Sequence, residues 1–162
     1  MTIKVGDTLP EATLTTMTEE GPGPVQTGDF FAGKTVVLFS VPGAFTPTCS
    51  ARHLPGFIDH IDAIKAAGAD EVACMSVNDV FVMDAWGKGA GADGKVVMLA
   101  DGNAEFASKL GLTFDGSGFG MGTRAQRFAL IAKDGVVSHL NVEEPGAFDV
   151  SSADYVLKQL NG

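Results

Sequence analysis

Positive charge is scarce in this chain of 162 residues, which has 11 lysine and arginine residues against 20 aspartate and glutamate residues. The formal net charge is −9, and the basic residues do not cluster. A nucleic-acid backbone is bound mainly through clusters of basic side chains. The charge balance therefore argues against a nucleic-acid partner.

Long apolar runs are also missing, since no stretch approaches the roughly 20 apolar residues of a transmembrane helix. Residues 1–7 lack the basic start and apolar core of a secretory signal. We therefore expect a soluble, cytoplasmic protein with no membrane partner.

Cysteine is rare, with only Cys49 and Cys74, which is too few for a disulfide framework. The two cysteines lack the paired spacing of a zinc site, and the three histidines have no ligand cluster around them. We expect no metal, and surface or packing roles for His53, His60 and His139.

Repeats, linkers and low-complexity segments are absent as well, which predicts a single domain over residues 1–162. We expect residues 21–24 to form a turn and Asp29 to cap the short turn after it. The glycine-rich residues 116–122 neither follow a predicted strand nor open a helix, so they do not match a dinucleotide fingerprint. We expect a flexible loop there and no cofactor.

From residue 35 onward, apolar runs alternate with segments of helical periodicity. Strands are predicted at residues 35–40, 71–77 and 95–100, and helices at residues 48–64, 79–86 and 103–110. Residues 127–132 and 136–142 predict a hairpin, and Ser151 is the expected N-cap of a last helix. The pattern predicts an α/β fold with a central mixed β-sheet flanked by helices on both faces.

Cys49 lies where the loop after the strand at residues 35–40 enters a helix. The unpaired amides of a first helical turn and the helix dipole favour an anion at such a position. Pro55 inside this helix would remove a backbone hydrogen bond and clash with the carbonyl of Ala51. We expect the first turn to be a separable unit that lets Cys49 leave its pocket.

Pro42, Thr46 and Cys49 match the P-x-x-x-T-x-x-C motif of peroxiredoxins, and residues 41–50 resemble the type II or peroxiredoxin-5 subfamily. Further similar segments at residues 53–57, 76–79, 99–102 and 122–128 extend the resemblance over essentially the whole chain. It implies a thioredoxin-like fold and a thiol-dependent peroxidase that reduces hydrogen peroxide and alkyl hydroperoxides. The thiolate would become a sulfenic acid, and the protein would serve antioxidant defence and redox homeostasis.

The resemblance also implies roles for particular side chains. Arg127 matches the family's guanidinium position and could hold both the thiolate and a peroxide oxygen, since it is permanently charged and multidentate. Arg124 is a second candidate for this role. Thr46 would contact bound peroxide through its hydroxyl, and Pro42 would shield the pocket from water.

Regeneration of the thiol is less constrained by the sequence. Cys74 lies among apolar residues and is most simply part of the core, although plant-like relatives carry a cysteine at this spacing that is suspected of resolving the sulfenic acid. Residues 148–152, where some peroxiredoxin-5 members place a resolving cysteine, contain none. We therefore expect an external thiol donor, which could be glutathione, glutaredoxin or thioredoxin.

Two further expectations concern association and function class. In the family, the region of Phe45 and Phe81 forms a dimer contact, so a homodimer is expected. A thioredoxin-like disulfide oxidoreductase is disfavoured because Thr46 stands where a C-x-x-C motif needs its first thiol. A redox sensor or holdase remains the alternative, because sensing begins with the same thiolate, and turnover with a reductant would distinguish the two.

Overall fold

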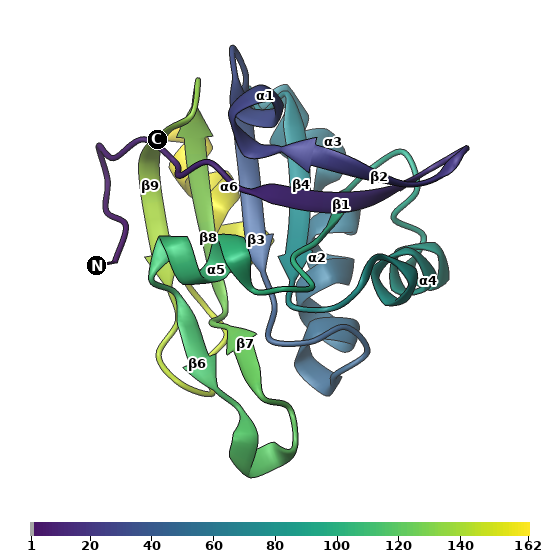
Figure 1. The fold of residues 1–162 in the computed structure, drawn as a ribbon. Helices are drawn as coiled ribbons and strands as arrows, with labels where there is room; N and C mark the ends of the chain where they lie inside the picture. The colour runs from purple at the N-terminus through teal and green to yellow at the C-terminus, as the bar shows by residue number, and fades with distance from the viewer. Residues whose placement is uncertain (1) are drawn as a thin grey trace.

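The computed structural model describes residues 2–162. Its centre is a seven-stranded mixed sheet in the order β2-β1-β5-β4-β3-β8-β9 (Figure 1). The two middle strands, β3 (Thr35–Ser40) and β4 (Glu71–Ser76), are parallel, and each is buried from its second residue onward. Burial on both faces explains why these strands have continuous apolar sequences.

The remaining strands extend the sheet to both sides. β5 (Val97–Ala100) is parallel to β4, and β8 (Phe128–Lys133) runs antiparallel to β3. The outer strands are β1 (Thr13–Thr18), β2 (Gly21–Gln26) and β9 (Val136–Val142). A separate antiparallel pair is formed by β6 (Thr113–Asp115) and β7 (Thr123–Ala125). The predicted mixed sheet is confirmed.

Helices cover both faces of this sheet, as predicted. One apolar cluster joins β3 and β4 to residues of α2 (Leu54–Asp59), α3 (Ile61–Ala66), α4 (Val80–Ala90) and α6 (Ala153–Asn161). The cluster on the opposite face takes residues from α1 (Thr27–Phe31) and α5 (Glu105–Leu110). No helix in residues 2–162 is long and apolar enough to cross a membrane.

Capping and turn residues define the ends of several elements. Asp79 caps α4, where its carboxylate accepts a hydrogen bond from the Val82 amide at 2.9 Å. Gly111 ends α5 in the left-handed conformation. Asp134 and Gly135 have φ values of 50° and 78°, which is the geometry of a tight hairpin turn between β8 and β9.

Three local predictions are wrong. Residues 21–24 lie within strand β2, and the turn precedes them at residues 19–20. Prolines are tolerated there because β2 is an edge strand, which has one side free of ladder bonds. Asp29 lies inside α1 and does not cap it, and the last helix is capped by Ser152, whose hydroxyl accepts from the Tyr155 amide.

The helix predicted over residues 48–64 is divided into three parts. Cys49–His53 form a π-helical turn, in which the Leu54 amide bonds to the carbonyl of Cys49, five residues back. Pro55 then lies in the first turn of α2, where its missing N–H costs little. The first turn is thus distinct in geometry from the helix that follows, and π turns often occur at functional sites.

Candidate active site

Cys49 begins the π turn and is fully buried, with a free thiol. The guanidinium of Arg127 donates a hydrogen bond from Nη2 to Sγ of Cys49 over 3.0 Å. The sheet register explains this approach, because Ser40 at the end of β3 pairs with Phe128. Arg127 therefore lies beside the point where the loop to Cys49 leaves the sheet.

Arg124, the other arginine candidate, is engaged elsewhere. Its Nη1 donates to the Val77 carbonyl at 3.1 Å and its Nε to the Met121 carbonyl at 2.9 Å. These bonds tie β7 to the chain segment after β4. The geometry therefore favours Arg127 as the cation of the site.

His53 is a site residue that the sequence reasoning missed. It is fully buried, with Nδ1 at 2.8 Å from Nη1 of Arg127 and Nε2 at 2.9 Å from the Ser151 carbonyl. A carbonyl only accepts, so Nε2 carries the ring hydrogen and Nδ1 accepts from Arg127. Burial, reinforced by the charge of Arg127, lowers the pKa of His53 to about 3, so the ring is neutral near pH 7.

The available sequence signal for His53 was its spacing of four residues from Cys49, which puts both side chains on one side of a helical turn. Phe148 completes this side of the site. Its ring centroid lies 5.0 Å from that of His53, and Arg127 approaches it at 5.9 Å. The guanidinium is thus held between a neutral acceptor, an aromatic ring and the thiol.

Thr46 and Pro42 lie in the loop between β3 and the π turn. The Thr46 hydroxyl donates to the Gly43 carbonyl at 2.6 Å, so its oxygen can accept a hydrogen bond from a ligand. Pro42 lines a cavity of about 600 Å³ together with Arg127, Phe114 and Phe119. This cavity is the open space next to the arginine that contacts the thiol.

Cys74 lies in the middle of β4, where it pairs with Phe39 on one side and Met98 on the other. It is fully buried, as the sequence predicted. Burial raises the pKa of the Cys74 thiol well above 9.0, and the nearby Cys49 raises it further, against a smaller opposing effect of Arg127. Cys74 is therefore protonated at neutral pH.

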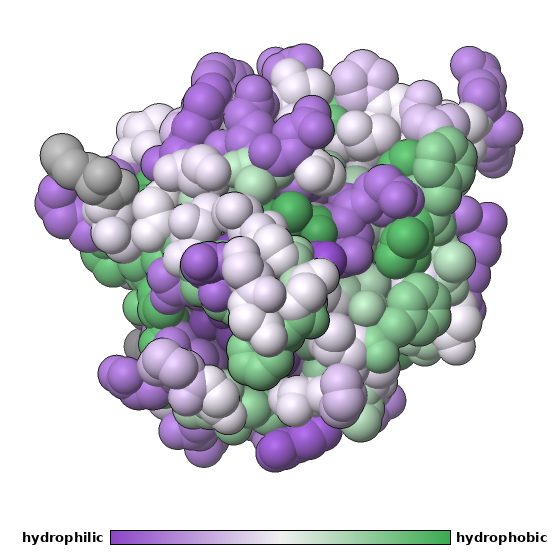
Figure 2. Space-filling model, turned by 60° about the horizontal axis from the view of Figure 1, so that its bottom comes forward, coloured by the Kyte–Doolittle hydropathy of each residue, from purple (hydrophilic) through white to green (hydrophobic). Residues whose placement is uncertain are grey.

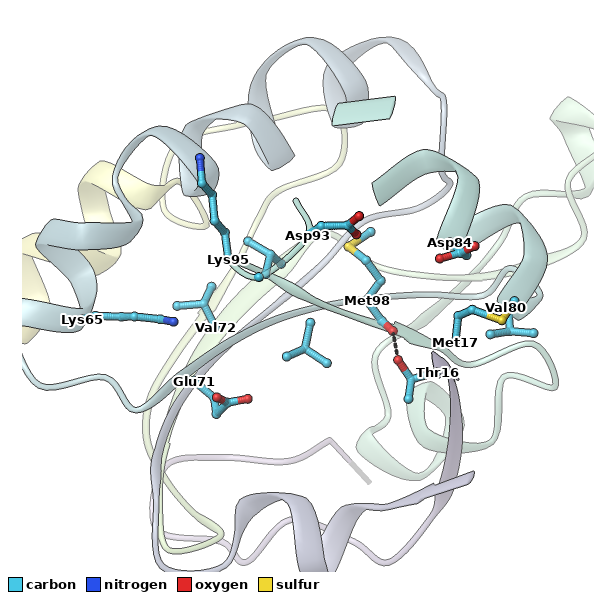
Figure 3. Close-up of a pocket in the computed structure, with 13 residues that line it drawn as sticks. Thr16, Met17, Lys65, Glu71, Val72, Val80, Asp84, Asp93, Lys95 and Met98 are labelled. Atoms are coloured by element: carbon cyan, nitrogen blue, oxygen red, sulfur yellow. Dashed lines mark hydrogen bonds between the residues drawn. The ribbon is translucent and has the colours of Figure 1, made fainter. Parts of the chain in front are cut away.

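A second hollow, of about 360 Å³, lies between β1, β5 and α4 (Figure 3). The charged side chains that line it are of both signs, namely Lys65, Lys95, Glu71, Asp84 and Asp93. It contains no cysteine or histidine. Among residues 2–162, no group of three or more potential metal ligands comes together.

The fold and the site define a class before any relative is considered. A mixed sheet with helices on both faces carries, after the loop that follows a central strand, a buried thiol bonded to an arginine. These are the features of a thiol-based redox protein, since an adjacent cation favours the thiolate.

Comparison with known proteins narrows this class. The Redoxin family model matches residues 4–157. Peroxiredoxin-2B of Arabidopsis thaliana is 48% identical over 161 residues, covering 98% of both chains. Chloroplastic Peroxiredoxin-2E of the same plant is also 48% identical, over 98% of this chain and 69% of the relative. The chain belongs to the redoxin family and is a peroxiredoxin of the type II or peroxiredoxin-5 kind.

Solved structures agree with this assignment. Reduced Prx3 from Vibrio vulnificus in complex with hydrogen peroxide superposes with a TM-score of 0.95 at 53% identity, covering 98% of this chain and 99% of that one. The oxidized form of that protein superposes with a TM-score of 0.90 at 54% identity, covering 97% of this chain and 99% of that one. The protein is thus a thiol-dependent peroxidase with a thioredoxin-like fold, and the sensor or holdase alternative is not favoured.

Proposed function

We propose that Cys49 is the peroxidatic cysteine and that Arg127 is its catalytic partner. The observation that carries this proposal is the 3.0 Å hydrogen bond from the guanidinium to Sγ. The Cys49 thiolate attacks one peroxide oxygen, the O–O bond breaks, and the leaving oxygen takes a proton and departs as water or an alcohol. The sulfur is oxidised by two electrons to a sulfenic acid.

Arg127 serves two stages of this step. Its guanidinium stabilises the thiolate before the reaction and presents further N–H groups to the peroxide, on which negative charge develops. The Thr46 hydroxyl, whose hydrogen is committed to Gly43, accepts the peroxide hydrogen and orients the substrate. Pro42 contributes no donor that would compete for the peroxide.

Hydrogen peroxide and alkyl hydroperoxides are the proposed substrates. The lining of the cavity beside Arg127 includes Phe114, Phe119 and Pro42, which suit an apolar alkyl group. Comparing kcat/KM for hydrogen peroxide, tert-butyl hydroperoxide and cumene hydroperoxide tests this. A loss of more than about a hundredfold for both organic substrates would contradict an open apolar cavity.

An external thiol is the proposed reductant, from glutathione with glutaredoxin or from thioredoxin. A donor thiolate attacks the sulfenic sulfur and releases water, and a second thiol then frees Cys49 as the donor disulfide forms. Burial of Cys74 within β4 supports this route. The test is peroxide consumption with each purified donor system supplied one at a time, and lack of turnover with all of them would contradict it.

A homodimer is the proposed assembly, through the surface that carries Phe45 and Phe81. These rings are 60% and 65% exposed, on the loop before Cys49 and on the first turn of α4. Figure 2 shows a face on which exposed apolar side chains are interspersed with polar ones. Exposed aromatic rings are typical of association surfaces.

Sedimentation of the reduced protein at micromolar concentration tests the dimer. A double variant with Phe45→Asp and Phe81→Asp should sediment as a monomer. The matched control is Val5→Asp, which adds one charge at another exposed apolar residue and should leave the dimer intact. A wild-type monomer would contradict the proposal.

A cytoplasmic location is also proposed, supported by two free thiols, which suit a reducing compartment. The relatives Peroxiredoxin-2E of Arabidopsis thaliana and Peroxiredoxin-2E-2 of Oryza sativa are named as chloroplastic proteins. Fractionation of the source cells, followed by immunodetection, tests the location, and enrichment in an organelle would contradict it.

A further inference from the structure

The guanidinium of Arg127 belongs to a closed ring of hydrogen bonds. It donates to Nδ1 of His53 at 2.8 Å, and Nε2 of His53 donates to the Ser151 carbonyl at 2.9 Å. The amide and hydroxyl of Ser151 donate to Oε2 of Glu143 at 2.8 and 2.6 Å. The ring closes where the Glu143 amide donates to the carbonyl of Arg127 at 3.0 Å.

We propose that Glu143 is a positioning residue for the peroxidase reaction. It holds Ser151 in place, so that the carbonyl of Ser151 fixes the ring hydrogen of His53 on Nε2. This tautomer leaves Nδ1 as an acceptor that aims Arg127 at the thiol. The inference rests on the function proposed above for Cys49 and Arg127.

The tautomer of His53 matters because a neutral imidazole has one donor and one acceptor nitrogen. With the hydrogen on Nδ1, two N–H donors would face each other across the 2.8 Å contact between His53 and Arg127. The guanidinium of Arg127 would have to turn away from His53, and its Nη2 would then lose the hydrogen bond to Sγ of Cys49. The Ser151 carbonyl is the group that prevents this arrangement.

Glu143 is built to hold that carbonyl. Its side chain is buried, and a single oxygen accepts three hydrogen bonds, two from Ser151 and one from the Asp149 amide at 2.6 Å. Burial raises the pKa of Glu143, but the hydrogen bonds from Ser151 and its neighbours lower it to below its usual value. Glu143 is therefore ionised at neutral pH, and its charge strengthens all three bonds.

The Glu143 carboxylate matters because the segment between β9 and α6 has no regular secondary structure to hold it. Residues 143–152 contain only turns and irregular backbone, and they return the chain from the sheet to the site. The Glu143 carboxylate bonds to residues six and eight positions further along this segment. Without it, the position of the Ser151 carbonyl would depend mainly on loop geometry.

The test compares Glu143→Ala with Glu143→Gln, whose amide oxygen can still accept. Asn141→Ala is the matched control, since Asn141 lies two residues earlier in the chain, near the end of β9, is equally buried and pairs with Gln159 outside the ring. The readouts are the ring ¹⁵N signals of His53, the rate at which iodoacetamide alkylates Cys49 at pH 7, and kcat/KM for hydrogen peroxide.

We expect wild-type His53 to carry its hydrogen on Nε2, and Glu143→Ala to mix the two tautomers. Alkylation and kcat/KM should then fall by about tenfold or more, the equivalent of one charge-assisted hydrogen bond. Glu143→Gln should keep the alkylation rate and kcat/KM within about threefold of wild type. Asn141→Ala should keep both quantities in the same range even if this variant unfolds at a lower temperature.

The following results would overturn the proposal. One is a wild-type His53 with its hydrogen on Nδ1, which needs no variant to be measured. Another is loss of activity in Glu143→Ala with the tautomer unchanged, or a changed tautomer with full activity. The third is an equal loss in Asn141→Ala. Failure of the proposed function is distinguished separately, since Cys49→Ser would then retain turnover.

Discussion

Replacing Cys74 with serine is predicted to leave most of the peroxidase turnover intact when an external thiol is supplied. A resolving cysteine attacks as a thiolate, and the pKa of Cys74 is raised well above 9.0 by burial. An ordinary cysteine thiol, with a pKa of about 8.5, is only a few per cent ionised at pH 7, and a raised pKa makes that fraction smaller still. Cys74 is therefore a slow nucleophile at neutral pH.

Movement of the backbone adds a second barrier. Cys74 is paired to Phe39 and Met98 across two ladders, and drawing it toward Cys49 breaks several backbone bonds at about 1 kcal/mol net each. The groups left unpaired in the core raise this cost to about 1–3 kcal/mol each. An external thiol avoids both penalties.

The assay is peroxide consumption by wild type, Cys74→Ser and Cys74→Ala with glutathione and glutaredoxin or with thioredoxin. Serine places a hydroxyl in a fully buried site and is expected to lower the unfolding free energy by about 1–3 kcal/mol. Alanine leaves no polar group there and controls for this effect. We expect turnover within about twofold of wild type for the alanine variant.

Mass spectrometry after one equivalent of peroxide shows which bond forms. We expect a sulfenic acid on Cys49 without donor and a mixed disulfide on Cys49 with glutathione. A dominant Cys49 to Cys74 bridge, with turnover lost in both variants, would refute the reasoning and show that β4 opens.

Three further predictions follow from the site. Arg127→Gln should lower kcat/KM for peroxide by more than about tenfold, because it removes the charge that stabilises thiolate and transition state; greater damage from Arg124→Gln would contradict the assignment. The indole of Trp86 donates to the Ser50 hydroxyl at 2.9 Å, so opening of the π turn on oxidation should change tryptophan emission, and unchanged emission argues against opening. Unfolded His53 binds a proton near pH 6.5 and folded His53 only near 3, so the unfolding free energy should fall by up to about 1.4 kcal/mol per unit as the pH drops through this window. Urea unfolding at several pH values should show that the unfolding free energy of His53→Gln changes less with pH than that of wild type. An equal pH dependence in the two proteins would contradict the buried neutral ring.

Periodicity in the sequence predicted the central elements because they are buried along almost their whole length or on one regular face. The strands β3 and β4 are continuously apolar, and α4 carries a standard cap at Asp79. The π turn at Cys49–His53 could not be predicted, since Pro55 requires a break without determining its geometry. The prolines in β2 misled the prediction because edge position is a property of the sheet, not of the local sequence.

The site residues likewise divide into those that the sequence predicted and those that only the structure revealed. Cys49, Thr46 and Pro42 come from one short motif, and the strand start at Arg127 could be matched by resemblance. The contact of His53 with Ser151 joins residues 98 positions apart, and the contact of Ser151 with Glu143 spans eight residues of irregular backbone. No local pattern marks these bonds, so the contributions of Ser151 and Glu143 emerge only when the chain is folded.

Peroxide consumption by the Cys49→Ser variant, with Cys74 intact and each donor system present, tests the central claim most directly. A serine hydroxyl is not appreciably ionised at neutral pH and cannot form a sulfenic acid. The account predicts turnover no faster than the reaction without enzyme, while wild type and Cys74→Ala remain active. Substantial turnover by Cys49→Ser would show that the peroxide is reduced elsewhere in the molecule and would contradict the account.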